Sequence, residues 1–142
     1  SPQAEGLAFQ KLDAPITDRA TIRMKFRSVQ KSGVTRNGAL VIATKPTNAA
    51  SFKVGTAIGM NQHVAFEGGW ANVGNAGKKK ASFASDATFE VSITVDLSTR
   101  KGTAEINGTH LKFVLPPGLS AIEYVGIYAK ATATEFSLPM VE

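Results

Sequence analysis

Three cationic side chains alternate along one short segment of the chain. In "ATIRMKFRS", residues 20–28, Arg23, Lys25 and Arg27 take every second position, and apolar residues take the positions between them. A period of two is typical of a β-strand with one buried and one solvated face. Arginine binds carboxylate or sulfate through two parallel hydrogen bonds. The row therefore predicts one side of an anion-binding groove.

A second interpretation of these cations needs no ligand. Like charges two residues apart on one strand face repel each other by roughly a few tenths of a kcal/mol. Acidic side chains on neighbouring strands relieve that repulsion, and Glu67, Glu90 and Glu105 are candidates for such pairing. Cations on a sheet surface also hinder unwanted strand pairing. The sequence leaves both interpretations open.

The only tryptophan, Trp70, lies within "FEGGWANVGNAGKKK", residues 66–80. Its Gly and Asn neighbours place it on or beside a loop, where its flat ring can stack on the apolar face of a sugar. Alternatively, Trp70 folds back and covers an open end of the protein. We interpret the lysines at 78–80 as a solvated turn that protects a sheet edge.

Two tyrosines share one face of a predicted strand. Tyr124 and Tyr128 are four residues apart, with Gly126 between them. Two aromatic rings with a glycine between them form a stacking platform in which the glycine leaves room for a sugar ring. The alternative is a pair of half-buried aromatic side chains at a sheet edge, with hydroxyl groups that reach water.

Only two histidines occur in the sequence, His63 and His110, and they are far apart. No Cys and no HExxH motif is present to complete a zinc site. We include His63 among the predicted ligand-binding residues. For both histidines the alternative is a strand residue hydrogen-bonded to its local surroundings.

These candidates must be positioned by strands, because alternating apolar and polar residues continue along most of the chain and no segment favours a helix. The clearest case is "TFEVSITVDL", residues 88–97, followed by a polar turn, a strand ending at Asn107-Gly108, and a third strand to residue 115. The Asn-Gly pair strongly favours a two-residue hairpin. Further strands are expected at 6–12, 20–28, 37–44, 52–60, 62–69 and 121–129, and in the last nine residues, where Pro139 marks an edge or a bulge.

Composition limits the possible classes of protein. The chain has 142 residues, which fits one domain at 1–142, and its lack of Cys excludes disulfides. The net charge of +5 favours an anionic partner. No apolar run is long enough for a membrane span, and no signal peptide precedes "SPQAEG", so we expect a mature chain or an excised domain.

The order "FEVSITVDLSTRKGTAEINGTHLKF", followed by "IEYVGIYAKATATEFSLPMVE", resembles concanavalin A-like lectin and glucanase domains. This family includes laminin-G-like modules and the jelly-roll domains attached to bacterial polysaccharide-active enzymes. The resemblance covers residues 85–142 and extends to "ATIRMKFRS". It implies a two-sheet antiparallel jelly roll, often with a glycan-binding concave face, and a final strand that pairs near the N-terminal one.

From the phase of the strands we expect two sheets packed face to face, with the first and last strands adjacent. The residues expected in the core are Phe89, Val91, Ile93, Val95, Phe113, Val125 and Ile127.

The residues for glycan cleavage are missing from the local sequence. Glucanases of the resembled family place acidic residues at alternating positions of one strand, so that two carboxylates flank the glycosidic bond. This chain has no two carboxylates at such spacing. Carboxylates from distant strands can still converge, but we predict no catalytic residues and no enzyme activity.

No cofactor is expected from the sequence. No glycine-rich loop joins a strand to a helix, so nucleotide binding is not indicated. Members of the resembled family often bind one structural calcium ion near the chain ends. Asp18 or Glu142 could contribute oxygen ligands here, although the sequence shows no cluster of carboxylates.

The sequence therefore favours a non-catalytic carbohydrate-binding module that recognises an anionic polysaccharide bearing uronate or sulfate groups. We expect it to be extracellular or periplasmic, monomeric or attached to a catalytic domain, with no nucleic-acid or membrane partner. Nucleic acid fits the charge, but the chain lacks interleaved aromatic and basic residues. The alternatives are a laminin-G-like protein-interaction domain and a glycan-cleaving enzyme domain.

Overall fold

The protein is built from β-strands. The computed structural model describes residues 6–28, 38–45, 61–67, 70–73, 80–82, 87–116, 119–129, 134–137 and 140–142. These residues contain twelve strands and no helix. The strands are Gly6–Ile16 (β1), Arg19–Ser28 (β2), Gly38–Ala43 (β3), Asn61–Glu67 (β4), Trp70–Val73 (β5), Lys80–Ser82 (β6), Thr88–Asp96 (β7), Lys101–Ile106 (β8), Thr109–Val114 (β9), Ile122–Ala129 (β10), Thr134–Phe136 (β11) and Met140–Val141 (β12).

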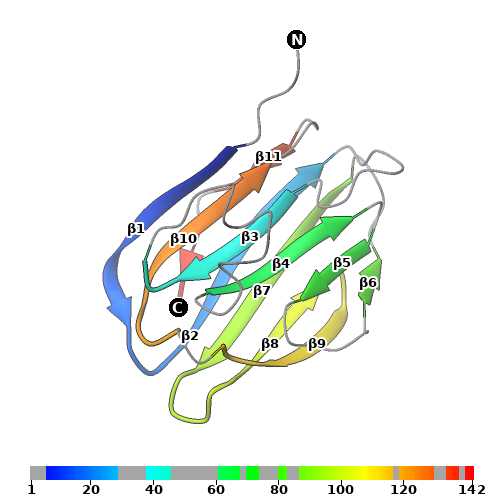
Figure 1. Cartoon of the computed structure of the whole chain (residues 1–142). Coiled ribbons are helices and arrows are strands. Elements are labelled where there is room, and N and C mark those ends of the chain that lie inside the picture. Colours follow the sequence, from blue (N-terminus) through cyan, green and yellow to red (C-terminus); the bar gives the residue numbers. More distant parts are fainter. Residues whose placement is uncertain are drawn as a thin grey trace.

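The strands form two antiparallel sheets that are stacked face to face (Figure 1). Sheet A has the order β1-β10-β3-β4-β5-β6. Sheet B has the order β11-β2-β7-β8-β9, and β12 also pairs with β2. This arrangement is the all-β sandwich of a jelly roll, as the sequence predicts.

One apolar core fills the space between the sheets. Leu40, Ile42 and Val125 reach it from sheet A, and Val91 and Ile93 reach it from sheet B. Burial along β7 alternates from residue to residue, because successive side chains of a strand point to opposite faces. All seven core residues expected from the sequence belong to this cluster.

The Asn107-Gly108 hairpin is confirmed. Both residues have positive φ angles, 48° for Asn107 and 83° for Gly108, as the favoured two-residue turn requires. The turn pairs Ile106 with Thr109 and Glu105 with His110. The side-chain amide of Asn107 donates a 3.2 Å hydrogen bond to the carbonyl oxygen of Ser82 on β6, which links the two sheets.

The expected adjacency of the first and last strands is wrong. β1 pairs with β10 in sheet A, whereas β12 pairs with β2 in sheet B. The chain changes sheet between Ile16 and Arg19, so the C-terminus meets the second strand. Thr21 and Glu142 exchange two backbone hydrogen bonds of 2.9 Å there.

Other strand boundaries differ from the expectation in detail. The last nine residues form two short strands, β11 and β12, and Pro139 between them lies outside the described residues. The sequence pattern missed β5 and β6, which are only four and three residues long. The strand expected at 52–60 also falls outside the described residues.

Candidate functional site

The cation row lies on the face of sheet B that points away from the core, here called the outer face of sheet B. Arg23, Lys25 and Arg27 alternate with the buried residues Ile22 and Met24 along β2. Lys25 and Arg27 are exposed and Arg23 is half-buried. The period-two prediction for this strand is confirmed, and the three cations are available from solvent.

Acidic residues lie beside or opposite the three cations in the strand register. Arg23 Nη2 lies 3.6 Å from Glu142 Oε2, with the Arg23 side chain half-buried and the Glu142 side chain exposed. In the strand register, Glu90 on β7 is directly opposite Lys25. Glu135 on β11 is directly opposite Arg27. Cross-strand neighbours at this separation interact, so charge pairing accounts for part of the row without any ligand.

A cavity of about 490 Å³ adjoins the cation row. Its lining includes Arg23, Glu90, Ser92, Glu105 and Asn107. These side chains supply a guanidinium, two carboxylates, a hydroxyl and an amide. Sugar hydroxyl groups both donate and accept hydrogen bonds, so a mixed set of donors and acceptors suits them.

The cavity is crossed by one row of paired residues that runs over four strands. Arg23 pairs with Ser92, Ser92 with Glu105, and Glu105 with His110. His110 Nε2 and Glu105 Oε2 are 3.2 Å apart. Sequence reasoning missed this row, although the Asn107-Gly108 turn alone implies the contact between residues 105 and 110.

Two features of the cavity bear on ligand binding. The Nε atom of Arg23 is buried and has no hydrogen-bond partner among the described residues. A buried donor without a partner is costly, but a ligand cannot reach this atom while the protein shields it from solvent. Glu90 and Glu105 come from adjacent strands into the same cavity, although they are fifteen positions apart in the sequence.

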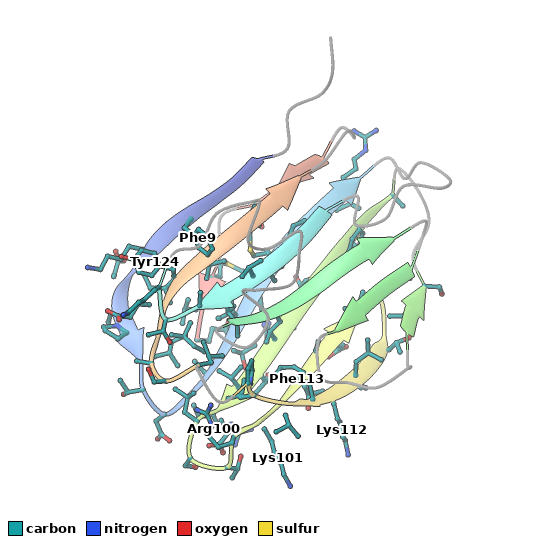
Figure 2. The ribbon with its side chains drawn as sticks, in the orientation of Figure 1. Phe9, Arg100, Lys101, Lys112, Phe113 and Tyr124 are labelled. Carbon is teal, nitrogen blue, oxygen red and sulfur yellow. The ribbon has the colours of Figure 1, made fainter. Side chains whose placement is uncertain are left out.

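Tyr124 lies on the outer face of sheet A, opposite the core residues Val125 and Ile127. Its ring packs edge-on against Phe9 of β1, with ring centroids 6.3 Å apart (Figure 2). A Cβ atom on Gly126 would lie 2.6 Å from Phe9 Cε1. The space that Gly126 leaves open is therefore filled by a ring of the protein itself.

The alternative proposed for the tyrosines fits the structure in part. Tyr124 is half-buried. However, β10 is not an edge strand, because it lies between β1 and β3.

The three remaining candidates are also in sheet A, where the structure describes their backbone positions. Tyr128 pairs with Leu7 and Ala39, and His63 pairs with Val41. Trp70 is the first residue of β5. The cation row and these four sheet A residues therefore belong to different layers of the sandwich, so the structure does not bring them together in one groove.

Metal and membrane sites are not apparent in the described part of the chain. No three His, Asp or Glu side chains gather there as a metal site. Glu142 pairs with Arg23, and the backbone oxygen of Asp18 accepts a 2.9 Å hydrogen bond from the Leu97 amide. Over the same ranges, no helix has the length and apolarity needed to cross a membrane.

Comparisons with known proteins identify the fold. No family model matches the chain, and a search of curated proteins finds no match. Among solved structures, a sialidase has a TM-score of 0.60 at 10% identity, with 91% of this chain but only 11% of the sialidase covered. Congerin II liganded with lactose and MES has a TM-score of 0.57 at 14% identity, with coverage of 96% and 99%. The carbohydrate binding module CBM66 from Bacillus subtilis has a TM-score of 0.57 at 10% identity, with coverage of 99% and 84%.

These similarities confirm the resemblance read from the sequence at the level of fold. The chain has the two-sheet jelly-roll fold of these proteins. At identities of 10% to 14%, they do not extend to the ligand or its site.

Proposed function

We propose that this protein is a non-catalytic carbohydrate-binding module that recognises an acidic polysaccharide through the outer face of sheet B. One observation carries the proposal: a solvent-facing cation row borders a cavity of about 490 Å³ whose polar groups suit sugar hydroxyls. The lectin-like fold, and the similarity to a lactose-bound protein and a carbohydrate binding module, support it.

The acidic character of the ligand rests on charge. The chain carries 16 Lys and Arg against 11 Asp and Glu. Arg23 offers a guanidinium to the cavity. A uronate carboxylate or a sulfate ester would accept hydrogen bonds from it.

The setting of the module is part of the proposal. We place it outside the cytoplasm, within a larger secreted protein that acts on polysaccharides. The chain spans about a tenth of the sialidase that it resembles, which is consistent with a module of a longer protein. Tyr124, Tyr128, His63 and Trp70 of sheet A remain candidate sugar contacts that are separate from the sheet B cavity.

A glycan array at low and moderate salt tests the proposed function. We expect binding to uronate-containing or sulfated glycans that weakens as salt rises, because exposed ionic contacts are screened. Binding confined to neutral glycans would contradict the acidic specificity. An array without any binding would contradict the carbohydrate function and favour a protein partner of the laminin-G type.

A further inference from the structure

A second and more basic cavity lies on the outer face of sheet B, at the end of the strands away from the Asn107-Gly108 turn. Its volume is about 580 Å³. Its lining includes Arg19 from β2, Lys101 from β8 and Lys112 from β9, all of them exposed. In Figure 2, Lys101 and Lys112 extend away from the ribbon at the lower end of the molecule.

The positive charge of this cavity is compensated only in part. Three cations line it against one carboxylate, that of Asp96, which is directly opposite both Arg19 and Lys101 in the strand register. The Oδ1 atom of Asp96 accepts hydrogen bonds of 2.9 Å from Ser98 N, 2.6 Å from Ser98 Oγ and 3.2 Å from Thr99 N, so this oxygen is already engaged by the turn. Within the described ranges, Arg19, Lys101 and Lys112 form no salt bridge. At the other end of the face, by contrast, Arg23 is paired with a carboxylate.

Strand register brings the two lysines close together. Lys101 pairs with Val114 and Lys112 pairs with Thr103, so the lysines are diagonal neighbours on adjacent strands. The cross-strand diagonal distance is about 7–8 Å. Lysine side chains that start from such neighbouring positions can bring both ammonium groups to one anion, which would offset their mutual repulsion.

The rest of the lining suits a sugar unit better than a bare anion. Thr94 and Thr103 place hydroxyl groups beside the cations, and Thr94 Oγ1 shares a 2.9 Å hydrogen bond with Thr21 Oγ1. Val114 adds an aliphatic surface that is 57% exposed. A hydroxylated ring with one acidic substituent would use all three kinds of group.

We propose that Arg19, Lys101 and Lys112 form a second subsite for a carboxylate or sulfate group of the polysaccharide, in addition to the contact that Arg23 offers in the first cavity. This inference rests on the proposed function and adds a site for its acid specificity. The alternative is that Lys112, on the edge strand β9, serves only to prevent strand pairing between molecules.

Matched charge reversals test the subsite. Lys112→Glu changes the cavity, and Lys45→Glu makes the same charge change at an exposed lysine after β3 of sheet A. The probes are polygalacturonate, its methyl ester and dextran sulfate, measured by calorimetry at fixed salt. We expect Lys112→Glu to raise the Kd for an acidic probe about tenfold or more, and Lys45→Glu to change it less than about twofold. The double variant Lys101→Gln/Lys112→Gln introduces no acidic group, and it should also raise the Kd for the acidic probe about tenfold or more.

Other outcomes would contradict the subsite or the proposed function. Equal losses in Lys112→Glu and Lys45→Glu would overturn the subsite in favour of diffuse charge attraction. If the methyl ester binds as tightly as polygalacturonate, the proposed acid subsite is wrong and the carbohydrate-binding function is retained. If the protein binds none of the probes and none of the arrayed glycans, both the subsite and the proposed function are wrong. Inorganic sulfate that binds as tightly as the polymers would indicate a free-anion site and overturn the proposal. If duplex DNA binds more tightly than the polysaccharide probes and this binding depends on Lys112, the proposal is overturned in favour of a nucleic-acid ligand.

Discussion

At the scale of single residues, the cation row of β2 has two roles that one double mutant separates. Each cation has a carboxylate beside it or opposite it, and Arg23 also lines a cavity. Replacing Arg23 and Arg27 by Ser should weaken binding of an acidic polysaccharide by about 1–3 kcal/mol, the range of lost charge-assisted hydrogen bonds. The melting temperature should barely change, because exposed ion pairs contribute little to folding. Titration calorimetry and thermal unfolding on the same variant give both quantities.

If the double mutant binds every glycan with the affinity of the wild-type protein, the cation row does not contact the ligand and is only a charge-paired surface. Loss of both affinity and stability would show that the change disturbs the sheet, and Lys45→Ser is the control for the removal of an exposed cation.

Aromatic rings lie against two glycines and leave no room for a Cβ atom at either position. Alanine substitution at the two positions should lower stability by different amounts. A Cβ atom on Gly102 would be 2.4 Å from the buried ring of Phe113 and 2.8 Å from the backbone oxygen of Thr94. On Gly126 it would meet only the half-buried ring of Phe9. Overpacking lowers the unfolding free energy by about 1–3 kcal/mol. We expect Gly102→Ala to lower it more than Gly126→Ala, because the core ring and the backbone oxygen beside Gly102 cannot move aside.

Urea denaturation measures both costs. A Phe9→Ala background should reduce the cost of Gly126→Ala, which a double-mutant cycle would detect as coupling. The same cost in both backgrounds would contradict the contact with the ring.

At the scale of elements, the turn between β7 and β8 depends on one ionised side chain. Hydrogen bonds from the Ser98 side chain and the Thr99 amide lower the pKa of Asp96, and the Ser98 amide and the nearby Arg19 add to this effect, whereas desolvation opposes it. A lowered pKa means that the folded state favours the charged carboxylate. The resulting stabilisation is complete above about pH 4 and is lost as the pH falls through the folded-state pKa.

Acid unfolding of Asp96→Asn tests this dependence. The variant should lose part of the decline in unfolding free energy below about pH 4, since it has no carboxylate to protonate there. Asp13→Asn, at an exposed aspartate of β1, is the matched control. Identical acid profiles for the wild-type protein and Asp96→Asn would contradict a stabilising role for the charge.

At the scale of the whole molecule, the sandwich gathers two carboxylates that the sequence keeps apart. Glu90 and Glu105 line one cavity, and paired carboxylates are the groups of glycan hydrolysis. His110 Nε2 lies 3.2 Å from Glu105 Oε2, and Arg23 of the same cavity pairs with Glu142. We expect the purified protein to release no reducing ends from polygalacturonate or dextran sulfate, and Glu90→Gln or Glu105→Gln to leave that background unchanged. Release that disappears in either variant would establish a hydrolase.

The sequence by itself determined the local structure of this protein. Period-two alternation specified β2 and β7 and the buried side of each, because the backbone geometry of a strand sends successive side chains to opposite faces. The Asn107-Gly108 turn specified the β8–β9 hairpin and its register, since only a positive-φ pair closes it.

The tertiary structure alone decided which of these local pieces meet. Nothing local assigns β2 to one sheet and β10 to the other, yet that assignment separates Arg23 from Tyr124. Phe9 covers Gly126 because β1 and β10, which are distant in the sequence, pair in a particular register. Strand partners and register depend on burying a shared core, which is a property of the whole chain and not of any segment.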